Sequence, residues 1–349
     1  MSILEKREFG TTKDGTMAYL YTIENQNGMK MTVTDFGAAL VNLFVPDRDG
    51  NLRDVVLGYD DARTYEERGA FFGAAVGRSA NRIKGAAFEI NGVSYQLEKN
   101  DNGENNLHSG NDFYNKRFWK VVQEKEDSIT FELYSPDKDQ GYPGALTMRV
   151  TYELTADGTL HLEYEAVPDK DTIINMTNHS YFNLGGHDSG DVLNHKLTID
   201  ADYFTRADAQ SIPTGELLEV AGTPMDFRSP HAIGERIDAD YEATRLGGGY
   251  DHNWVLKNDG KFAKVAEAAD EESGIGMEVW TDLPGMQVYT ANFLENEPGK
   301  GGVLYQGRSA VCFETQYFPD AIHHDHFAGP VCKAGETYRT VTEYRFDRL

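Results

Sequence analysis

The sequence predicts an all-β fold, a large antiparallel β-sandwich with few short helices. Runs such as residues 29–34 and 160–167 alternate apolar and polar side chains with a period of two, which is typical of half-buried strands. Turn signals built on Asn-Gly and Asp-Gly separate such runs at residues 47–51, 91–92, 156–158 and 258–260. These dipeptides favour tight hairpins because Asn, Asp and Gly tolerate positive φ. Long helical periodicity, a βαβ rhythm and a repeat of fixed period are all missing from the sequence.

The helices expected beside these strands are short. We place them within residues 59–69 and near residues 233–241, and we interpret residues 267–274 as an acidic, Ala-rich loop or turn. No Pro- or Ser-rich linker divides the chain. Since large all-β folds run long as one unit, we expect a single domain over residues 1–349.

The charge of the chain narrows the classes of partner. Asp and Glu number 57 against 33 Lys and Arg, which gives a formal net charge of -24. Such a surface repels phosphate backbones and anionic membranes, so we expect neither as a partner. No apolar stretch reaches the ~18 residues of a spanning helix, and the N-terminus lacks the pattern of a signal peptide.

The chain contains two cysteines, Cys312 and Cys332, which do not form a CxxC pair. So few thiols suit a reducing compartment, and we expect a cytoplasmic location. Cys312 lies in an apolar run and is predicted to be a small buried residue rather than a catalytic thiol.

Residues 174–184 form an apolar and polar alternation without Lys, Asp or Glu. If the segment is one strand, its polar face holds Asn175, Thr177, His179, Tyr181 and Asn183. Strands that face solvent usually carry some charge, whereas an uncharged polar face with His and Tyr resembles the lining of a sugar site. An ordinary exposed strand is the alternative, and the pattern alone leaves both open.

Glu314 follows an apolar run that suits a buried strand. A carboxylate in that position must be paired, hydrogen-bonded or functional, because burying an unpaired charge is very unfavourable. Partial desolvation raises the pKa of a Glu and turns it into a useful base. The alternative is a structural Glu held by an Arg or by backbone N–H groups.

Residues 72–83 place Arg78, Asn81 and Arg82 directly after a small apolar run bracketed by glycines. The guanidinium offers fixed donors for sugar oxygens or for a carboxylate, although an Arg paired with an acid at the edge of the core is equally in keeping with the pattern. The glycines match no phosphate-binding motif.

The remaining polar candidates are weaker when each is taken alone. His108, Asp251 and Gln287 each stand alone in the sequence, without a neighbouring catalytic group. A single His is more often structural than catalytic. His323, His324 and His326 are able to bind a metal adventitiously, but their spacing matches no zinc signature. We therefore expect no required metal.

Six motifs, taken together, resemble the aldose 1-epimerase (galactose mutarotase) family. They occur in the family's order, at residues 77–83, 107–110, 177–184, 250–253, 284–292 and 314–321. The resemblance extends from Gly10 to residues 338–346, and six ordered matches across nearly the whole chain are highly specific. It implies a galactose mutarotase-like β-supersandwich.

The resemblance also implies an activity: interconversion of the α and β anomers of free aldohexoses such as glucose or galactose by acid–base ring opening and closure. Glu314 matches the family's general base and His179 its general acid. The residues that match sugar-binding or polarising positions are Asn81, Arg82, His108, Tyr181, Asp251 and Gln287. No cofactor and no metal are implied, the partner is a small sugar, and the chain is expected as a monomer or homodimer.

The sequence departs from the family pattern at Tyr317, at His323 and His324, and near Asn111, which leaves substrate preference open. Two alternatives share the fold: an epimerase of hexose 6-phosphates, which needs a basic phosphate pocket, and a non-catalytic sugar-binding protein. A third, a glycoside hydrolase, requires two carboxylates flanking the glycosidic bond, for which Asp251 and Glu314 are the pair to consider.

Overall fold

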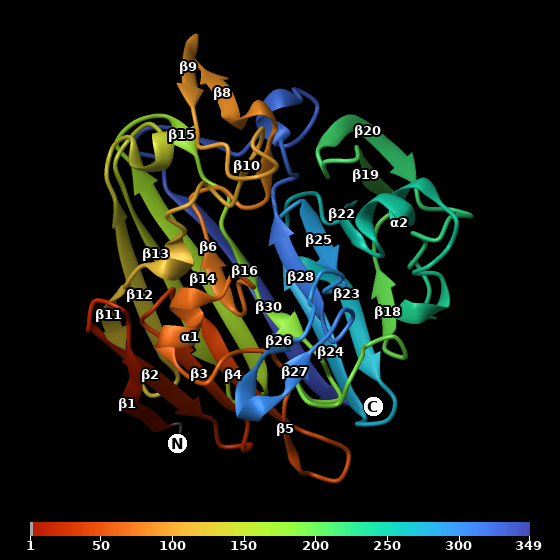
Figure 1. Ribbon diagram of the computed structural model, residues 1–349. Coiled ribbons are helices and arrows are strands. Elements are labelled where there is room, and N and C mark those ends of the chain that lie inside the picture. Colours follow the sequence, from red (N-terminus) through yellow and green to blue (C-terminus); the bar gives the residue numbers. More distant parts are fainter. Residues whose placement is uncertain (1–2) are drawn as a thin grey trace.

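The computed structural model describes residues 3–349, which form three large antiparallel sheets and several two-stranded ones. Among these residues are only two α-helices, α1 (Ala62–Glu67) and α2 (Glu242–Gly247). The predicted all-β fold with few short helices is therefore confirmed (Figure 1). Neither helix within the described range is long and apolar enough to cross a membrane.

The largest sheet has nine strands, and the last strand of the chain lies near its middle. In order across the sheet they are β11 (Lys120–Glu124), β12 (Ser128–Ser135), β13 (Leu146–Leu154), β14 (Thr159–Pro168), β30 (Tyr338–Arg348), β24 (Ile275–Thr281), β23 (Ala263–Asp270), β18 (Lys196–Ile199) and β21 (His231–Ala232). Because β30 pairs with both β14 and β24, the end of the chain joins the two halves of this sheet.

The other two large sheets have five and six strands. The five-stranded sheet contains β1 (Ile3–Thr11), β2 (Met17–Glu24), β3 (Lys30–Thr34), β4 (Leu40–Pro46) and β5 (Leu52–Asp54). The six-stranded sheet contains, in order, β17 (Tyr181–Phe182), β28 (Val311–Gln316), β25 (Gly285–Tyr289), β22 (Asp251–Val255), β19 (Tyr203–Ala207) and β20 (Pro213–Glu219).

Short strand pairs complete the fold. They are β6 (Ala74–Val76) with β16 (Thr177–His179), β7 (Arg82–Ile83) with β10 (Asn106–Leu107), β8 (Ala87–Ile90) with β9 (Val93–Gln96), β15 (Thr172–Ile173) with β29 (Val331–Cys332), and β26 (Glu297–Pro298) with β27 (Leu304–Tyr305).

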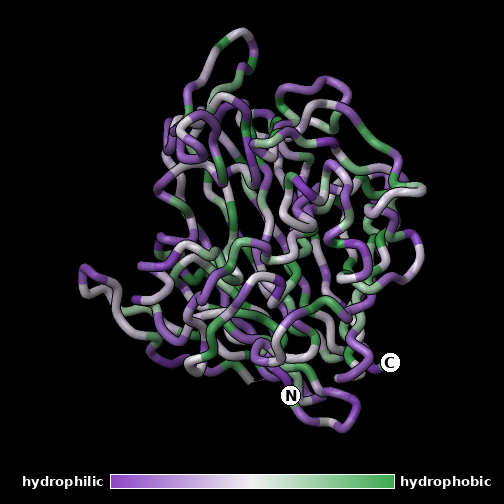
Figure 2. The backbone as a smooth tube through the Cα atoms, turned by 45° about the vertical axis from the view of Figure 1, so that its right-hand side comes forward, coloured by the Kyte–Doolittle hydropathy of each residue, from purple (hydrophilic) through white to green (hydrophobic). Residues whose placement is uncertain are grey.

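One buried hydrophobic cluster connects the three large sheets. Val33 of the five-stranded sheet, Val150 of the nine-stranded sheet and Trp254 of the six-stranded sheet all belong to it. Burying an aliphatic or aromatic side chain of this size stabilises the fold by about 1.5–3 kcal/mol. Figure 2 shows hydrophobic stretches along the interior strands, whereas many outer loops are hydrophilic. The sheets therefore pack face to face, as expected for a sandwich.

Three of the four predicted turns join paired strands. Residues 47–51 connect β4 to β5, residues 91–92 connect β8 to β9, and residues 156–158 connect β13 to β14. The turn at residues 258–260 lies between β22 and β23, which belong to different sheets, so a hairpin there was the wrong prediction. Its Asn258 side chain donates instead to the backbone carbonyls of Thr281 and Leu283 (3.0 and 2.8 Å).

The expected helices and loop are partly corrected. Helix α1 lies within residues 59–69 as predicted, and the Asp61 carboxylate caps it by accepting from the Thr64 N–H (2.9 Å). Residues 233–241 hold only a 3-10 turn, because the backbone leaves helical geometry at Arg236, and α2 begins after them.

Residues 267–274 were interpreted as a loop or turn, which is wrong for residues 267–270, since β23 continues to Asp270, and correct for the turn at residues 271–274. Ala266 and Ala268 point into the core while Glu267 is exposed. The strand period is therefore present, but alanine side chains are too small to make it conspicuous in the sequence.

Candidate active site

The eight residues singled out from the sequence line one open pocket of about 240 Å³. Its lining consists of Phe71, Asn81, Arg82, Leu107, His108, His179, Tyr181, Asp251, Gln287, Tyr289, Phe293 and Glu314. They come from strands of the six-stranded sheet, from the short strands β7, β10 and β16, and from the connecting segments that hold Phe71, Asn81, His108 and Phe293. Tyr317, His323 and His324, where the sequence departs from the family pattern, are not among the lining residues.

Three neighbouring strands supply the polar floor of the pocket. Gln287 of β25 is paired with Glu314 of β28 on one side and with Asn253 of β22 on the other. Asp251 precedes Asn253 by two residues and so points to the same face of the sheet. Gln287 donates from Nε2 to Asp251 Oδ1 (2.7 Å), which fixes the orientation of both side chains.

His179 and Tyr181 reach the pocket through a change of strand partner. β16 pairs with β6, whereas β17 pairs with β28, so residues 174–184 do not form the single strand that we predicted. The corner lies at Ser180, whose backbone N–H donates to Asn178 Oδ1 (3.0 Å). This local hydrogen bond competes with continued strand pairing and turns the chain toward the second partner.

The uncharged polar face of this segment is buried, so the exposed-strand alternative is wrong. Only part of that face serves the pocket, however. Asn175 Oδ1 accepts from the Tyr317 N–H (2.9 Å), and Asn183 Nδ2 donates to the Ser309 carbonyl (2.9 Å). These two amides satisfy buried backbone groups, which explains why the face is polar beyond the pocket.

The His179 imidazole is held from several sides. Its ring lies nearly parallel to those of Tyr181 and Phe71, with an interplanar angle of 17° to each. Its Nδ1 lies 3.6 Å from the Cys312 sulfur, and its Nε2 lies 3.7 Å from Glu314 Oε2. Cys312 is fully buried as predicted. The imidazole therefore presents Nε2 to the carboxylate and to the pocket.

Burial acts on both members of this pair. Glu314 is 2% exposed, and desolvation together with the nearby Asp251 carboxylate raises its pKa well above the usual range, while Arg82 acts in the opposite direction. Desolvation lowers the pKa of His179 to about 4. Both effects favour the neutral forms of Glu314 and His179.

His108 lies beside the pair and is fixed as a hydrogen-bond donor. Its Nδ1 accepts from the backbone N–H of Asn81 (3.1 Å), so in the neutral imidazole the proton is on Nε2. Desolvation, together with the neighbouring His179 and Arg82, lowers the pKa of His108 well below the usual value, which keeps the ring neutral. Asn81 and His108 both have positive φ (60° and 49°), a strained conformation that is often found at functional sites.

Ligand atoms of His108, His179 and Glu314 lie within 4.8 Å of one another, the one such group among residues 3–349. A metal needs a lone pair on each nitrogen. On His108 the Nδ1 lone pair is engaged by the Asn81 N–H, and Nε2 carries hydrogen. The donor set therefore suits proton transfer better than metal binding.

The histidines at 323–326 are engaged elsewhere. His323 Nδ1 contacts Asp320 (2.6 Å), and the Nε2 atoms of His324 and His326 contact the carbonyls of Pro213 and Gly215.

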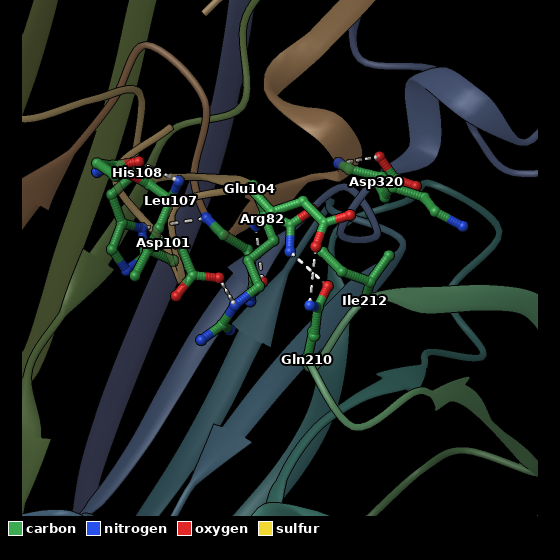
Figure 3. Close-up of polar contacts among 12 residues, drawn as sticks. Arg82, Asp101, Glu104, Leu107, His108, Gln210, Ile212 and Asp320 are labelled. Carbon is green, nitrogen blue, oxygen red and sulfur yellow. Dashed lines mark hydrogen bonds and ion pairs between the residues drawn. The ribbon is translucent and has the colours of Figure 1, made fainter. Parts of the chain in front are cut away.

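The two arginines of residues 77–83 have different roles. Arg78 is fully buried and donates to the carbonyls of Pro143 and Gly144 (2.8 and 2.9 Å), so it supports the structure. Arg82 lines the pocket while its Nε donates to Asp101 Oδ2 (2.9 Å), as Figure 3 shows. The alternative of an Arg paired with an acid thus holds for Arg82, but that pairing leaves it in the site.

Four lining residues were missed by the sequence prediction. Tyr289 lies two residues after Gln287 on β25, so strand parity alone would have placed it on the pocket face. Leu107 precedes His108 directly. Phe71 and Phe293 lie in loops without a readable period; Phe293 is 69% exposed at the pocket and its ring is stacked on that of Tyr289.

Comparison with known proteins gives matches over nearly the whole chain. Residues 19–345 match the family model described as aldose 1-epimerase. The chain is 38% identical to an aldose 1-epimerase of Escherichia coli K12, over 95% of this chain and 96% of that protein. It is 39% identical to a galactose mutarotase of Bos taurus, over 91% of each chain.

A solved structure gives the same picture. A protein of C. elegans, described as a GalM/aldose epimerase homologue, superimposes with a TM-score of 0.88 at 30% identity, covering 95% of this chain and 99% of that one.

Proposed function

The chain belongs to the aldose 1-epimerase family, and on that premise we propose that it interconverts the α and β anomers of a free aldohexose such as glucose or galactose. It is an isomerase. The observation that carries the assignment of the chemistry is the contact between the buried side chains of Glu314 and His179, which lie 3.7 Å apart in the pocket. Both groups lie at positions where one can accept a proton while the other donates one.

The reaction needs one proton taken from the sugar and one given back. Glu314 removes the proton of the C1 hydroxyl, the C1–O1 bond becomes a carbonyl as the C1–O5 bond breaks, and His179 protonates O5 from Nε2. The aldehyde then rotates about C1–C2. Closure on the other face reverses each transfer, so Glu314 returns its proton to O1 and His179 recovers one from O5. No oxidant is consumed and no net proton is gained.

The protonation states of Glu314 and His179 change during this cycle, and burial shifts the balance between the two states. The cyclic sugar meets ionised Glu314 and protonated His179, whereas the open sugar lies between neutral Glu314 and neutral His179. Because desolvation raises the pKa of Glu314 and lowers that of His179, it favours the second state. Burial therefore favours the step from the ion pair to the neutral pair that accompanies ring opening, and a positioned acid or base typically contributes a factor of about 10²–10⁴ to the rate.

The other pocket residues are assigned to binding and polarisation. His108 donates from Nε2 toward the ring oxygen and Arg82 offers its terminal N–H groups, so both stabilise the negative charge that develops there. Asp251 and Gln287, which are already hydrogen-bonded to each other, accept and donate to the sugar hydroxyls. Asn81 holds His108 in place, and the Tyr181 ring supports the His179 imidazole.

Polarimetry of freshly dissolved α-glucose and α-galactose tests this proposal. Glu314→Gln is isosteric and is expected to lose most turnover, by about 10²–10⁴-fold, while sugar binding is largely retained. Glu219→Gln, at an exposed position on β20, is the matched control and is expected to leave the rate unchanged. A Glu314→Gln enzyme that mutarotates at nearly the wild-type rate would overturn the assignment.

The pocket's charge disfavours the phosphorylated-sugar alternative. Arg82 is the only cationic side chain in its described lining, and Asp101 pairs with it, while Asp251 and Glu314 add carboxylates. A phosphate dianion in the pocket would meet a single positive charge, that of Arg82, which Asp101 already compensates. Comparing rates with glucose and glucose 6-phosphate separates the two. Tight sugar binding without mutarotation would favour a binding protein, and release of reducing sugar from a glycoside would favour a hydrolase.

The remaining expectations concern the cell and the assembly. Cys312 and Cys332 are both free thiols, which supports a reducing, cytoplasmic location. The partner is a small sugar, and the chain acts as a monomer or homodimer. Light scattering on the purified protein measures the oligomeric state, and fractionation of cells that express it measures the location.

A further inference from the structure

Arg82 is held at one nitrogen only. Its Nε donates to Asp101 Oδ2 at 2.9 Å, with the side chains 18% and 13% exposed. Within residues 3–349, the two terminal nitrogens of Arg82 have no protein hydrogen-bond partner, although the residue lines the pocket. The guanidinium is planar, so fixing Nε also fixes the direction in which these terminal N–H groups point.

Asp101 is itself held by a closed turn behind the pocket. The backbone N–H of Asp101 donates to the Asn105 carbonyl and the Asn105 N–H donates back (3.0 and 2.9 Å). Asn105 Oδ1 accepts from the Gly85 N–H, and its Nδ2 donates to Gln210 in the loop between β19 and β20 (both 3.0 Å). Gln210 in turn donates to Glu104 (3.0 Å), as Figure 3 shows.

The segment that follows Asp101 also leads to His108, the second donor assigned to the ring oxygen. Leu107 of β10 pairs with Arg82 of β7, and the next residue is His108. Figure 3 shows the Arg82–Asp101 contact close to Leu107 and His108, with the Gln210 contacts on its other side. Asp101 is thus the only charged anchor of Arg82 among the described residues, and it is part of a rigid turn rather than a flexible side chain on the surface.

We propose that Asp101 is a positioning residue for the anomerisation: it orients Arg82 so that the terminal N–H groups face the sugar, and it offsets the positive charge that Arg82 exerts on Glu314. The inference rests on the proposed function of the pocket. Asp101 does not line the pocket itself, so it acts through Arg82 rather than on the sugar.

The groups around Glu314 determine whether removal of the Asp101 charge raises or lowers the pKa of Glu314. The charged and titratable groups near Glu314 come from every neighbouring element. They are Asp251 from β22, Arg82 from β7, His179 and Tyr181 from β16 and β17, Tyr289 from β25, Cys312 from β28, Tyr344 from β30 and His108 from its loop. Arg82 lowers the pKa of both Glu314 and Asp251. An Asp101 carboxylate 2.9 Å from Arg82 weakens that influence, so its removal strengthens it.

Two variants separate position from charge. Asp101→Asn keeps an oxygen that accepts from Nε but removes the charge, so we expect kcat/KM at the optimum to change by less than about threefold. Since the pKa of Glu314 falls, the alkaline limb of the pH–rate profile should move to lower pH by about 0.5–1 unit. Asp101→Ala removes both, and a loosened Arg82 is expected to lower kcat/KM by about 10–100-fold.

Asp238→Asn is the matched control, because Asp238 forms a bidentate pair with Arg308 (2.9 and 2.7 Å) that is not part of the pocket. Asp238→Asn should leave both kcat/KM and the alkaline limb of the pH–rate profile unchanged. Circular dichroism and thermal unfolding establish that each variant is folded, and the isosteric Asn variant decides the question if the Ala variant does not fold. Wild-type kcat/KM and an unmoved alkaline limb in folded Asp101 variants would overturn the inference. If the wild-type protein fails to mutarotate any aldose, the proposed function fails instead.

Discussion

In the proposed mechanism, the pH dependence of the reaction follows from the single proton that Glu314 and His179 share. Activity requires that the pair holds one proton, because with two there is no base and with none there is no acid. The second proton goes to His179, whose pKa burial lowers to about 4, and the only proton leaves from Glu314, whose pKa burial and Asp251 raise. We therefore expect a bell-shaped profile of kcat/KM with an unusually low acid limb.

The magnitude of the acid limb can be worked out from His179. At pH 7, which is three units above a pKa of about 4, about one molecule in a thousand carries both protons. Near pH 4 about half do, and below that the rate should fall about tenfold for each pH unit. An ordinary exposed histidine would begin to lose activity more than two units higher. On the alkaline side the rate should fall as pH rises through the raised pKa of Glu314.

Polarimetry from about pH 3 to pH 10 measures the profile. Spontaneous mutarotation is also catalysed by acid and base, so the rate with the inactive Glu314→Gln protein is subtracted at each pH. Asp251→Asn removes a carboxylate that raises the pKa of Glu314, and it should move only the alkaline limb, to lower pH. An acid limb centred between pH 6 and 7 would refute the conclusion that burial lowers the pKa of His179.

Three further predictions concern single side chains. Asp35→Asn should stabilise the protein by about 1–2 kcal/mol at pH 7 but not at pH 3.5 in urea unfolding, because partial burial raises the pKa of Asp35 to about 6 and native stability is lost as pH rises from about 4 through 6. Lys300→Met leaves buried Asp54 without its partner (2.6 Å) and should lower the free energy of unfolding by about 3–5 kcal/mol. Phe293→Ala should raise KM about two- to tenfold with kcat unchanged in polarimetry.

The strand pattern predicted the fold, because its period depends on local backbone geometry, whereas most of the site residues were assigned through the resemblance of the six motifs. It placed His179 and Tyr181 on one face, and they do share the pocket, although the chain changes partner at Ser180 between them. That corner depends on the hydrogen bond between Asn178 and Ser180, and Asn and Ser side chains are too common for such a bond to be foreseen. The buried carboxylate of Glu314 was foreseen for a physical reason. A charge after an apolar run must be paired, hydrogen-bonded or functional, because burying it unpaired is very unfavourable.

Other features depend on tertiary contacts that no local pattern records. Which of two nearby arginines enters the pocket is decided by distant carbonyls, since those of Pro143 and Gly144 hold Arg78 in the interior while Asp101 holds Arg82 at the site. Phe71 joins the pocket through a positive φ of 57°. A Phe in a loop gives no sequence signal for this, because the conformation is unfavourable for it and is imposed by the surrounding structure.

The division between strands and loops in the pocket has a consequence for how the enzyme can vary. The proposed acid–base pair and the Asp251–Gln287 contact lie on or beside paired strands, where a shift of register would remove all of these groups from the pocket at once. Phe71, His108 and Phe293 lie in connecting segments. Loops accept substitutions that strands do not. Preference among aldoses should therefore be altered by changes at Phe71 and Phe293, while changes on β28 and β16 should abolish turnover for every aldose alike. A panel of free aldoses assayed with Phe71 and Phe293 variants distinguishes these outcomes, since a uniform loss across the panel would show that the loop aromatics support the chemistry rather than the choice of sugar.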